Sequence, residues 1–511
     1  MKNLKQTNNN FSDSANNNII KVNLKKNDAA ISNADLYETR KIFADVYDTE
    51  IEATIAVVAY NRPDVTELCI ESILKYTKDV NYKLLLIYNE NENGKGILEY
   101  FKNADYKNKA IIHISENLGA PLAYQEALKH FEGKYFVHLP NDVIVTPRWL
   151  SNLIKCAESD KKIGMVNPVS SNASNLQCVD FDFDNYDELQ ECADKFNVSD
   201  SSKWSERIRL ITLGTLFTRE CLSAIGNIFD TGFFHNFGDD DVSFRARRAG
   251  YKLILAEDTW VHHNHTFSNN ANNSLETGRK NFKEKYLGID AWDDTTNFVF
   301  TILEKYLNKP DSDNVKILGI DTKCGTPVLD IKNMIRKYGV CEPKVSAFTS
   351  DAKYYTDLKT ICSNDVVCGE AYKIPMSFSD NFNYIIIDKS LNTYPDYQKL
   401  LCQIYNMLSS GGQLFFNMQN TDNIFRFLKM CGKYSYSATE EAADFNIGNF
   451  YSDCKSKYNI QLISVLPVET TDDTITFVRS ILEAVNNGNT EKATELSNML
   501  VADKYWFSIT K

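Results

Sequence analysis

Apolar and polar positions follow strand and helix patterns in turn from about residue 52 to residue 150. Short apolar runs typical of strands occur at 54–59, 83–88, 110–114 and 134–139, and apolar residues at helical spacing occur at 65–76 and 120–131. Thr146 and Pro147 predict the N-cap and first position of a further helix. This alternation is typical of a mainly parallel sheet with helices on both faces, so we expect an α/β fold.

Polar residues directly follow three of the predicted strands. They are Tyr60, Asn61 and Arg62 after the first, Asn89 and Glu90 after the second, and Asn141 and Asp142 after the strand at 134–139. Ligands of parallel sheets bind beyond the carboxyl ends of the strands, so these residues should converge on one edge. Asp142 could hold a hard divalent cation shared with a diphosphate, although Asn-Asp after a strand is more often a simple turn.

Three consecutive acids, Asp239, Asp240 and Asp241, begin a predicted helix that Gly250 ends. One or two of them could serve as an N-cap and interact with the helix dipole. Three exceed what a cap needs, and a surplus carboxylate beside its neighbours is expected to have a raised pKa. Such a group could serve as a general base.

A histidine cluster follows about one strand later. His262, His263 and His265 are three of the seven histidines of the chain. If this segment is extended, His263 and His265 share one face and His262 lies on the other, so only one face can point at a metal ion. Neutral imidazole is a good ligand for manganese, while the remaining histidines would be surface or packing residues.

The second half of the chain repeats the strand and helix pattern. Strand-like runs occur at 315–321, 382–388 and 413–416, and a helical pattern at 400–408 leads to the Gly411-Gly412 turn. Two further helical patterns at 477–485 and 493–500 flank an Asn-rich turn. We interpret this helical pair as a packing or interaction surface.

The length, net charge and cysteine content of the chain limit the classes of protein to which it can belong. The 511 residues exceed what one core usually supports, so two or three domains are expected. The net charge of −12 disfavours a nucleic-acid partner. Twelve cysteines without a Cys-x-x-Cys pair indicate reduced thiols, and the sequence contains neither a signal-peptide core nor eighteen consecutive apolar residues. We therefore expect a cytoplasmic protein without a transmembrane segment.

Residues 52 to about 267 resemble a family 2 glycosyltransferase of the GT-A fold, an inverting group that uses nucleotide-diphosphate sugars. The matching segments, in the order of the family, are Val57–Arg62, Glu116–Gly119, Leu139–Val145, Leu213–Glu220, the acidic helix start and Val261–His263. Asn141 stands where the metal motif usually has its first acid, which leaves Asp142 with most of the charge. The family often has an Asp after the second strand, where this chain has Asn89 and Glu90.

The resemblance implies a role for each matched residue. Asp142 and His263 would bind Mn2+ or Mg2+, and Asp240, or Asp239 if the register is one residue off, would take the proton of the acceptor hydroxyl. Gly214 and Thr215 would line the acceptor side. The residues implied in donor binding are Tyr60, Asn61, Arg62, Asn89, Glu90, Asn117, Gly119, Asn141 and Asp142.

Residues 315 to about 420 resemble a class I methyltransferase domain of the Rossmann type, and its continuation to the end of the chain is left open. Lys323 and Pro327 occupy two of the three usual glycine positions of the cofactor loop. We therefore expect a degenerate domain that does not bind S-adenosylmethionine and is kept for architecture, acceptor docking or dimerisation.

These observations predict five regions: a polar N-terminal segment at 1–50 with a short helix over 34–50, a GT-A domain at 51–270, a helical linker at 271–313, the Rossmann-like domain at 314–420, and a helical extension at 421–511. We expect a hexosyl- or N-acetylhexosaminyltransferase that uses a UDP-sugar such as UDP-GlcNAc. Its acceptor would be a glycan or the Ser/Thr hydroxyls of a bacterial surface or flagellar protein. The alternatives are a bifunctional glycosyltransferase and methyltransferase in glycan synthesis, and a non-catalytic scaffold with decayed domains; a homo-oligomer is left open.

Overall fold

A computed structural model describes residues 19–23, 41–233, 236–264, 272–296, 298–340, 342–425, 428, 442–443, 446–468 and 470–511. The chain divides into two compact units, and each unit consists of several segments that are not consecutive in the sequence. The first takes residues up to 199 with 211–238 and 258–274, and the second takes 200–210, 239–257 and 275–511. Within the described residues, no helix has the length and apolar character that crossing a membrane requires.

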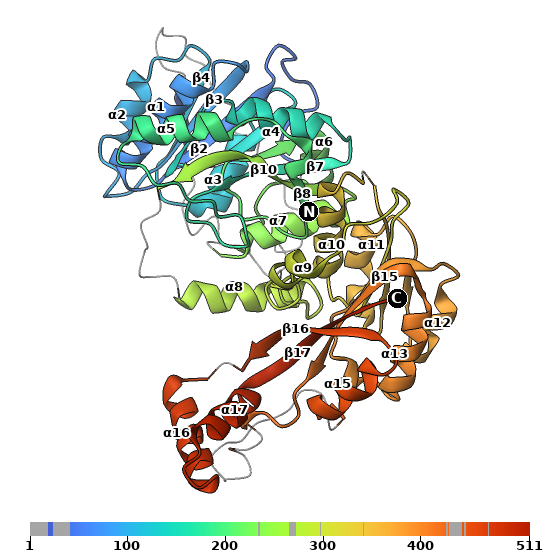
Figure 1. The fold of residues 1–511 in the computed structure, drawn as a ribbon. Helices are drawn as coiled ribbons and strands as arrows, with labels where there is room; N and C mark the ends of the chain where they lie inside the picture. The colour runs from blue at the N-terminus through green and yellow to red at the C-terminus, as the bar shows by residue number, and fades with distance from the viewer. Residues whose placement is uncertain are drawn as a thin grey trace. The chain divides into compact units, whose positions relative to one another are not determined.

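The first unit is built on a mixed sheet (Figure 1). Its strands are β1 (Ile19–Val22), β2 (Ala53–Ala59), β3 (Tyr82–Asn89), β4 (Lys109–Ile114), β5 (Tyr135–Pro140), β6 (Val143–Ile144), β7 (Ile163–Ser170), β9 (Thr215–Thr218) and the second half of β10 (Lys252–His263). Its helices are α1 (Pro63–Tyr76), α2 (Ile97–Asn103), α3 (Gly119–Leu128), α4 (Trp149–Glu158), α5 (Tyr186–Phe196) and α6 (Arg219–Ile225). The sheet order is β1-β4-β3-β2-β5-β9-β7-β10-β6.

Parallel pairing joins five strands at one side of this sheet. Strands β1, β4, β3, β2 and β5 pair in parallel, whereas β9 is antiparallel to both β5 and β7. All seven residues of β2 are buried, as expected for a central strand covered on both faces. The predicted strands and helices between residues 52 and 140 are therefore confirmed, and so is the α/β class.

Two local predictions in this unit are wrong. Helix α4 begins at Trp149, not at Pro147, because the hydroxyl of Thr146 donates to the carbonyl of Trp260 and does not cap the helix. Residues 41–50 are not helical, and the rest of the expected helix at 34–50 lies outside the described residues. The rings of Phe43 and Tyr47 lie 5.3 and 3.9 Å from the guanidinium of Arg219, so packing holds this segment in an irregular conformation.

The second unit contains a doubly wound sheet with the order β13-β12-β11-β14-β15-β17-β16 (Figure 1). Its strands are β11 (Lys316–Ile320), β12 (Lys344–Thr349), β13 (Val366–Cys368), β14 (Phe382–Ile387), β15 (Leu408–Gln419), β16 (Asn459–Pro467) and β17 (Ala502–Thr510). The strands up to β15 pair in parallel, and β17 is antiparallel to β15 and β16. The order reverses between β11 and β14, so the predicted Rossmann-like arrangement is confirmed.

Helices of the second unit flank this sheet or join its strands. They are α7 (Gly238–Arg248, with Gly238 in the first unit), α8 (Asn272–Lys285), α9 (Phe300–Tyr306), α10 (Thr326–Lys337), α11 (Tyr355–Ile361), α12 (Ile374–Ser377), α13 (Tyr397–Asn406), α15 (Ile447–Lys455), α16 (Asp472–Val485) and α17 (Thr490–Leu500). The unit also contains β8 (Trp204–Arg207), which pairs with the first half of β10.

The prediction of a helical extension at 421–511 is wrong for residues 459–467 and 502–510, which are strands. The helix pair α16 and α17 is present, but it connects β16 to β17, which complete the second sheet. Trp506, Phe507 and Ile509 of β17 are at most 1% exposed. Their pairing with residues of β15 that lie 89 to 95 positions earlier stabilises them as a strand. A short apolar run does not by itself distinguish a strand from a buried helix.

Candidate functional site

The carboxyl ends of β2, β3 and β5 meet at one edge of the first sheet. These strands are neighbours and parallel, with Ala59 opposite Tyr88 and Val58 opposite Pro140. The polar residues that follow the three strands therefore lie along the same edge, as the sequence predicts. This is the edge at which open α/β sheets bind their ligands.

The turn after β2 combines backbone strain with an unsatisfied acceptor. Asn61 and Arg62 have positive φ angles of 56° and 50°, which non-glycine residues rarely adopt. The side-chain oxygen Oδ1 of Asn61 is buried and has no hydrogen-bond partner among the described residues. Tyr60 is 44% exposed, and Arg62 pairs with Asp64 at 3.0 Å. A strained turn with an unsatisfied buried acceptor is the kind of feature found at ligand sites.

The side chain of Asn89, at the end of β3, forms hydrogen bonds with other residues of the protein through both its nitrogen and its oxygen. Its Nδ2 donates to Oδ1 of Asn117 at 2.7 Å, and its Oδ1 accepts from the amide of Leu118 at 3.0 Å. Oδ1 of Asn117 also accepts from the amide of Gly119 at 3.0 Å. Both asparagines thus fix the start of α3, and Asn89 is only 1% exposed. Its observed role is to hold the loop that carries Asn117 and Gly119.

Glu90 is the more exposed of the two residues placed after β3. Its carboxylate lies 2.7 Å from Nε2 of His113, and 45% of its side chain is exposed. The ring of His113 also stacks on Tyr88 at 5.5 Å between centroids. The contact with His113 holds Glu90 at the edge of the sheet with part of its carboxylate in solvent.

Asp142 and His263 are brought together by the pairing of β6 with β10. His263 lies opposite Val143 in the antiparallel ladder, and Oδ2 of Asp142 is 3.5 Å from Nε2 of His263. Nδ1 of His263 lies 3.3 Å from the carbonyl of Asn172, and its backbone amide donates to Oγ of Ser171 at 3.0 Å. Burial alone would lower the pKa of His263, but the hydrogen bond and charge of Asp142 outweigh it and raise the pKa.

His262 has a different environment. The extended β10 places it on the opposite face, as the alternation predicts. Its Nδ1 lies 2.8 Å from Oγ of Ser171, and its ring packs edge-on against Phe183. Burial lowers the pKa of His262 to about 4, which makes it a neutral packing residue at pH 7. His265 lies outside the described residues.

The donor set at Asp142 and His263 fits a divalent cation of the manganese type. Because a carbonyl can only accept, the contact with Asn172 requires the proton on Nδ1 of His263. Nε2 is therefore the nitrogen that could bind a cation, which would take the place of the Nε2 proton that faces Asp142. One imidazole nitrogen and one carboxylate suit Mn2+. The described residues contain no group of three His, Cys, Asp or Glu side chains arranged for a metal, so a bound ion needs further ligands from its substrate or from water.

The two residues predicted for the acceptor side lie at the start of β9. Gly214 has a positive φ of 76°, and a Cβ there would be within 3.5 to 3.8 Å of Leu139, Pro168 and Trp149. Thr215 is fully buried, and its hydroxyl donates to Asn167. The structure therefore gives Thr215 a packing and hydrogen-bonding role, and Gly214 provides the backbone conformation of the turn.

The acidic helix start lies in the second unit as the first turn of α7. Asp239 is half-buried, whereas Asp240 is 5% exposed and its Oδ1 accepts from Nη1 of Arg209 at 3.1 Å. Burial raises the pKa of Asp240 although Arg209 opposes this shift, so the expectation of a raised pKa in this cluster is confirmed. No pattern in the sequence points to Arg209, because it lies 31 residues before its partner.

Asp241, the third acid, is a structural residue. It is fully buried between Arg245 at 2.7 Å and Lys285 at 2.6 Å, and the hydroxyl of Tyr286 donates to it at 2.7 Å. Burial alone would raise the pKa of Asp241, but Arg245 and Lys285 bring it below its ordinary value. Asp241 thus stays ionised and holds α7 to α8.

A groove of about 420 Å3 lies elsewhere, between α13 and α15 of the second unit. It is lined by Tyr397, Phe450, Tyr458 and polar residues of the two helices. None of the residues predicted for the site lines this groove.

Comparison with known proteins supports the first resemblance. Residues 54–200 match the model of the family described as glycosyl transferase family 2, so the chain contains a domain of this kind. No curated protein matches the chain.

Three solved structures resemble parts of the chain. The mannosyltransferase PcManGT from Pyrobaculum calidifontis, in complex with GDP-Man and Mn2+, is 14% identical over 62% of this chain and 77% of its own, with a TM-score of 0.34. GalNAc-T7 with UDP, GalNAc and Mn2+ is 13% identical over 65% of this chain and 59% of its own, with a TM-score of 0.38. A SAM-dependent methyltransferase from Archaeoglobus fulgidus is 12% identical over 45% of this chain and 98% of its own, with a TM-score of 0.28.

Proposed function

We propose that the chain is a metal-dependent, inverting glycosyltransferase that moves a sugar from a nucleotide-diphosphate donor to a hydroxyl acceptor. The observation that carries the proposal is the Asp142–His263 pair, 3.5 Å apart, where Asp142 follows β5 at the ligand-binding edge of the sheet. Asp142 and the strands of this edge lie inside the region that matches the family 2 model.

Asp142 and His263 would hold Mn2+ or Mg2+, which as a Lewis acid would neutralise the charge that develops on the leaving diphosphate. The side chains around them would bind the rest of the donor. The unsatisfied Oδ1 of Asn61 can accept a hydrogen bond from the nucleoside, and the exposed ring of Tyr60 can pack on its base. Asn141, whose Nδ2 donates to Thr66 at 2.8 Å, would lie beside the ribose.

A carboxylate at the start of α7 would act as the general base. As the acceptor oxygen bonds to the anomeric carbon, the bond to the diphosphate breaks, and the hydroxyl proton passes to the carboxylate. Asp240 is only 5% exposed, whereas Asp239 is half-buried and so more open to an acceptor hydroxyl. We therefore assign the base to Asp239 and give Asp240, the other candidate, the role of orienting the helix start.

The proposal also covers the donor nucleotide, the acceptor and the location. Glu90, whose side chain is 45% exposed, stands where a uracil would be read, which favours a UDP-sugar such as UDP-GlcNAc as donor. Attachment of a second domain suits a polypeptide acceptor, such as Ser/Thr of a bacterial surface or flagellar protein. The described cysteines are all free thiols, which favours a cytoplasmic location.

Donor turnover tests the proposal directly. UDP-, GDP- and dTDP-sugars are incubated with Mn2+ and the wild type or Asp142→Ala, with exposed Asp182→Ala as the matched control. We expect one donor to be bound or slowly hydrolysed only with metal, by the wild type and the control but not by Asp142→Ala. If no donor is bound or turned over, the non-catalytic scaffold takes the place of this proposal.

The base and the acceptor need separate measurements. Asp239→Asn should lose transfer while it still binds donor, and Asp240→Asn should keep part of the transfer activity; the opposite ranking would assign the base to Asp240. Intact-mass analysis of candidate acceptor proteins should show a hexose or N-acetylhexosamine increment. A product series without such an increment would refute the polypeptide acceptor and leave a glycan.

A further inference from the structure

Helix α7 begins in the region that resembles a glycosyltransferase, yet its residues from Asp239 onward form one compact unit with the Rossmann-like sheet. We propose that the Rossmann-like domain is a positioning scaffold for α7, with Asp357 of α11 as its principal anchor. This inference rests on the proposed function, in which a carboxylate of α7 is the base. Asp357 is a positioning residue, because it acts through the helix.

The C-terminal end of α7 is fastened by a fully buried carboxylate. Oδ1 of Asp357 accepts from Nη2 of Arg247 at 3.0 Å, and Oδ2 accepts from Nη2 of Arg248 at 2.7 Å. The side chain of Asp357 is 0% exposed and that of Arg247 is 2% exposed. Nη1 of Arg247 also donates to Thr360 at 2.8 Å. Removal of one partner of such a buried pair leaves an uncompensated charge, so the contact strongly favours this one position of α7.

The N-terminal end of α7 is connected to α10 through the segment 200–210. Arg209 of this segment pairs with Asp240, and the amide of Leu210 donates to Oγ of Ser243 at 3.1 Å. The segment is itself held by Glu206, whose carboxylate lies 2.8 Å from Nζ of Lys332 in α10, with both side chains at most 6% exposed. Each end of α7 is thus tied, directly or through one intermediary, to a helix of the Rossmann-like domain.

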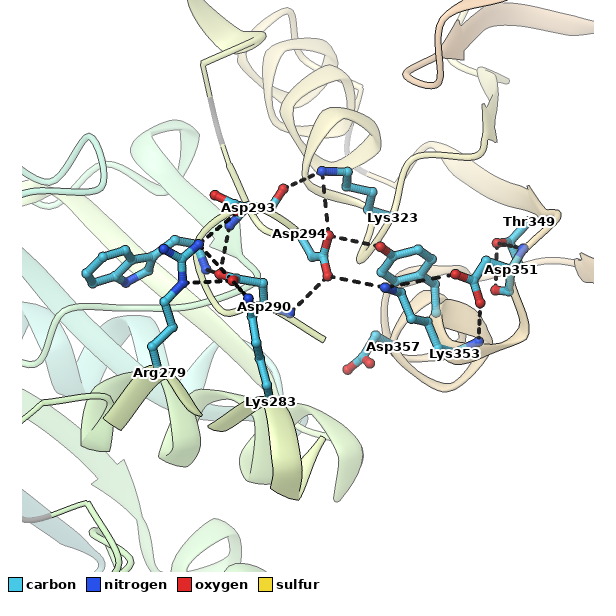
Figure 2. A network of polar contacts seen from close by, with 12 residues as sticks. Arg279, Lys283, Asp290, Asp293, Asp294, Lys323, Thr349, Asp351, Lys353 and Asp357 are labelled. Atoms are coloured by element: carbon cyan, nitrogen blue, oxygen red, sulfur yellow. Dashed lines mark hydrogen bonds and ion pairs between the residues drawn. The ribbon is translucent and has the colours of Figure 1, made fainter. Parts of the chain in front are cut away.

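A third connection runs through α8, which holds Asp241 with Lys285 and Tyr286. Figure 2 shows how α8 is tied in turn to the second sheet. Arg279 and Lys283 of α8 pair with Asp290, each at 2.7 Å. Four residues later, Asp294 accepts from the hydroxyl of Tyr354 at 2.9 Å and lies 3.5 Å from Nζ of Lys323, which follows β11.

The same contacts fill the edge at which a doubly wound sheet usually binds a nucleotide. Asp321, directly after β11, accepts from the amide and hydroxyl of Ser350 and from the hydroxyl of Tyr394. The amide of Cys324 donates to the carbonyl of Asp294 at 3.2 Å. A Cβ on Gly325 would lie 2.2 Å from Cδ1 of Ile361, so this glycine allows close packing of α11. The polar groups at this edge that could contact a cofactor form hydrogen bonds within the protein instead.

The consequence for catalysis follows from the geometry that proton transfer requires. A shift of about 1 Å in a catalytic group, caused by a distant change, can lower the rate about a hundredfold. Loss of the Asp357 contact should therefore lower the rate of transfer. Donor affinity should stay unchanged, because the proposed metal and donor residues are in the first unit.

The test compares Asp357→Asn with Asp365→Asn, an exposed carboxylate of the same domain. The measurements are the transfer kcat, the Kd for the donor with Mn2+, and hydrogen exchange of the backbone amides of 238–248. We expect Asp357→Asn to lower kcat at least about tenfold, to leave the donor Kd within about twofold, and to speed exchange across α7. Asp365→Asn should change none of these.

Wild-type kcat and wild-type exchange in Asp357→Asn would overturn the inference. If the wild type turns over no donor, the proposed function fails, while the exchange measurement still decides whether Asp357 holds α7. If Asp357→Asn does not fold, Arg248→Gln replaces it, because Arg248 is 28% exposed and its loss leaves Arg247 paired. S-adenosylmethionine should bind to none of these proteins in calorimetry; binding to the wild type would contradict the scaffold role.

Discussion

Asp330 of α10 is a buried carboxyl group whose charge has little compensation. It is 2% exposed, and its Oδ2 has no hydrogen-bond partner among the described residues. Burial raises the pKa of Asp330 to about 7 from the ordinary 3.8, although Arg207 opposes the shift. The folded protein therefore binds this proton more tightly than the unfolded chain does.

The magnitude of the effect follows from linkage. Because the folded-state pKa is raised, the associated stability is fully present below about pH 4 and is lost as pH rises through about 7. The rise of the pKa from 3.8 to about 7 corresponds to at most ~4 kcal/mol in total. Between pH 6 and pH 8 the wild type should lose about 1.4 kcal/mol of this stability, because the folded protein releases most of this proton in that range.

Asp330→Asn removes the titration and keeps the shape of the side chain. We expect its free energy of unfolding, relative to the wild type, to improve by about 1.4 kcal/mol between pH 6 and pH 8. Urea unfolding followed by circular dichroism at both pH values measures this change, with exposed Asp313→Asn as the control. The difference between two pH values cancels any constant cost of the new amide. If wild type and Asp330→Asn change in parallel, Asp330 is not protonated in the folded state near pH 6 and the argument is wrong.

Three further predictions concern separate contacts. Gly133→Ala should destabilise by about 2 to 4 kcal/mol in urea unfolding, because a Cβ at this positive-φ position would lie 2.6 Å from the carbonyl of Ile51; no loss would show that the loop can move. Glu206→Gln should cost about 3 kcal/mol, because it leaves the buried Lys332 charge only the exposed carboxylate of Glu342, 3.9 Å away; a thermal melt equal to the wild type would contradict this. His263→Ala should weaken Mn2+ binding with nucleotide about 10- to 100-fold in calorimetry, and unchanged affinity would exclude His263 as a ligand.

The parallel strands of the first unit were predictable because their signals are local. Strands β2 to β5 are short apolar runs, and the helices between them show a 3.6-residue period, so each element can be recognised without its neighbours. Strand β17 differs in this respect. Its stability comes from pairing with β15 and β16, and neither partner can be identified from the local pattern of residues 502–510. The start of α4 was misplaced for the same reason, since Thr146 is bound by a strand more than a hundred residues later.

The candidate site was predictable to the same degree. Residues after strand ends reach a common edge whatever their partners, so the placement of Asn89 and Asp142 could be expected from the order of elements. The partners themselves depend on tertiary structure. The sequence alone does not show that the side-chain amide of Asn89 donates a hydrogen bond to Asn117. Nor does it show that Arg209 pairs with Asp240.

The boundaries of the domains also depend on tertiary contacts that the order of motifs along the chain does not show. A linear division places the acidic motif at 239–241 with the sugar-transfer region, because motif order is read along the chain. In the structure, the acidic motif belongs to the same compact unit as the second sheet. Arg247 and Arg248 form ion pairs with the buried Asp357, and Asp241 pairs with Lys285. At the edge of the second sheet, Asp294 accepts a hydrogen bond from Tyr354, and Tyr394 donates to Asp321. Buried ion pairs join α7 to the same unit, so a cut near residue 270 would separate this helix from Asp357 and Lys285.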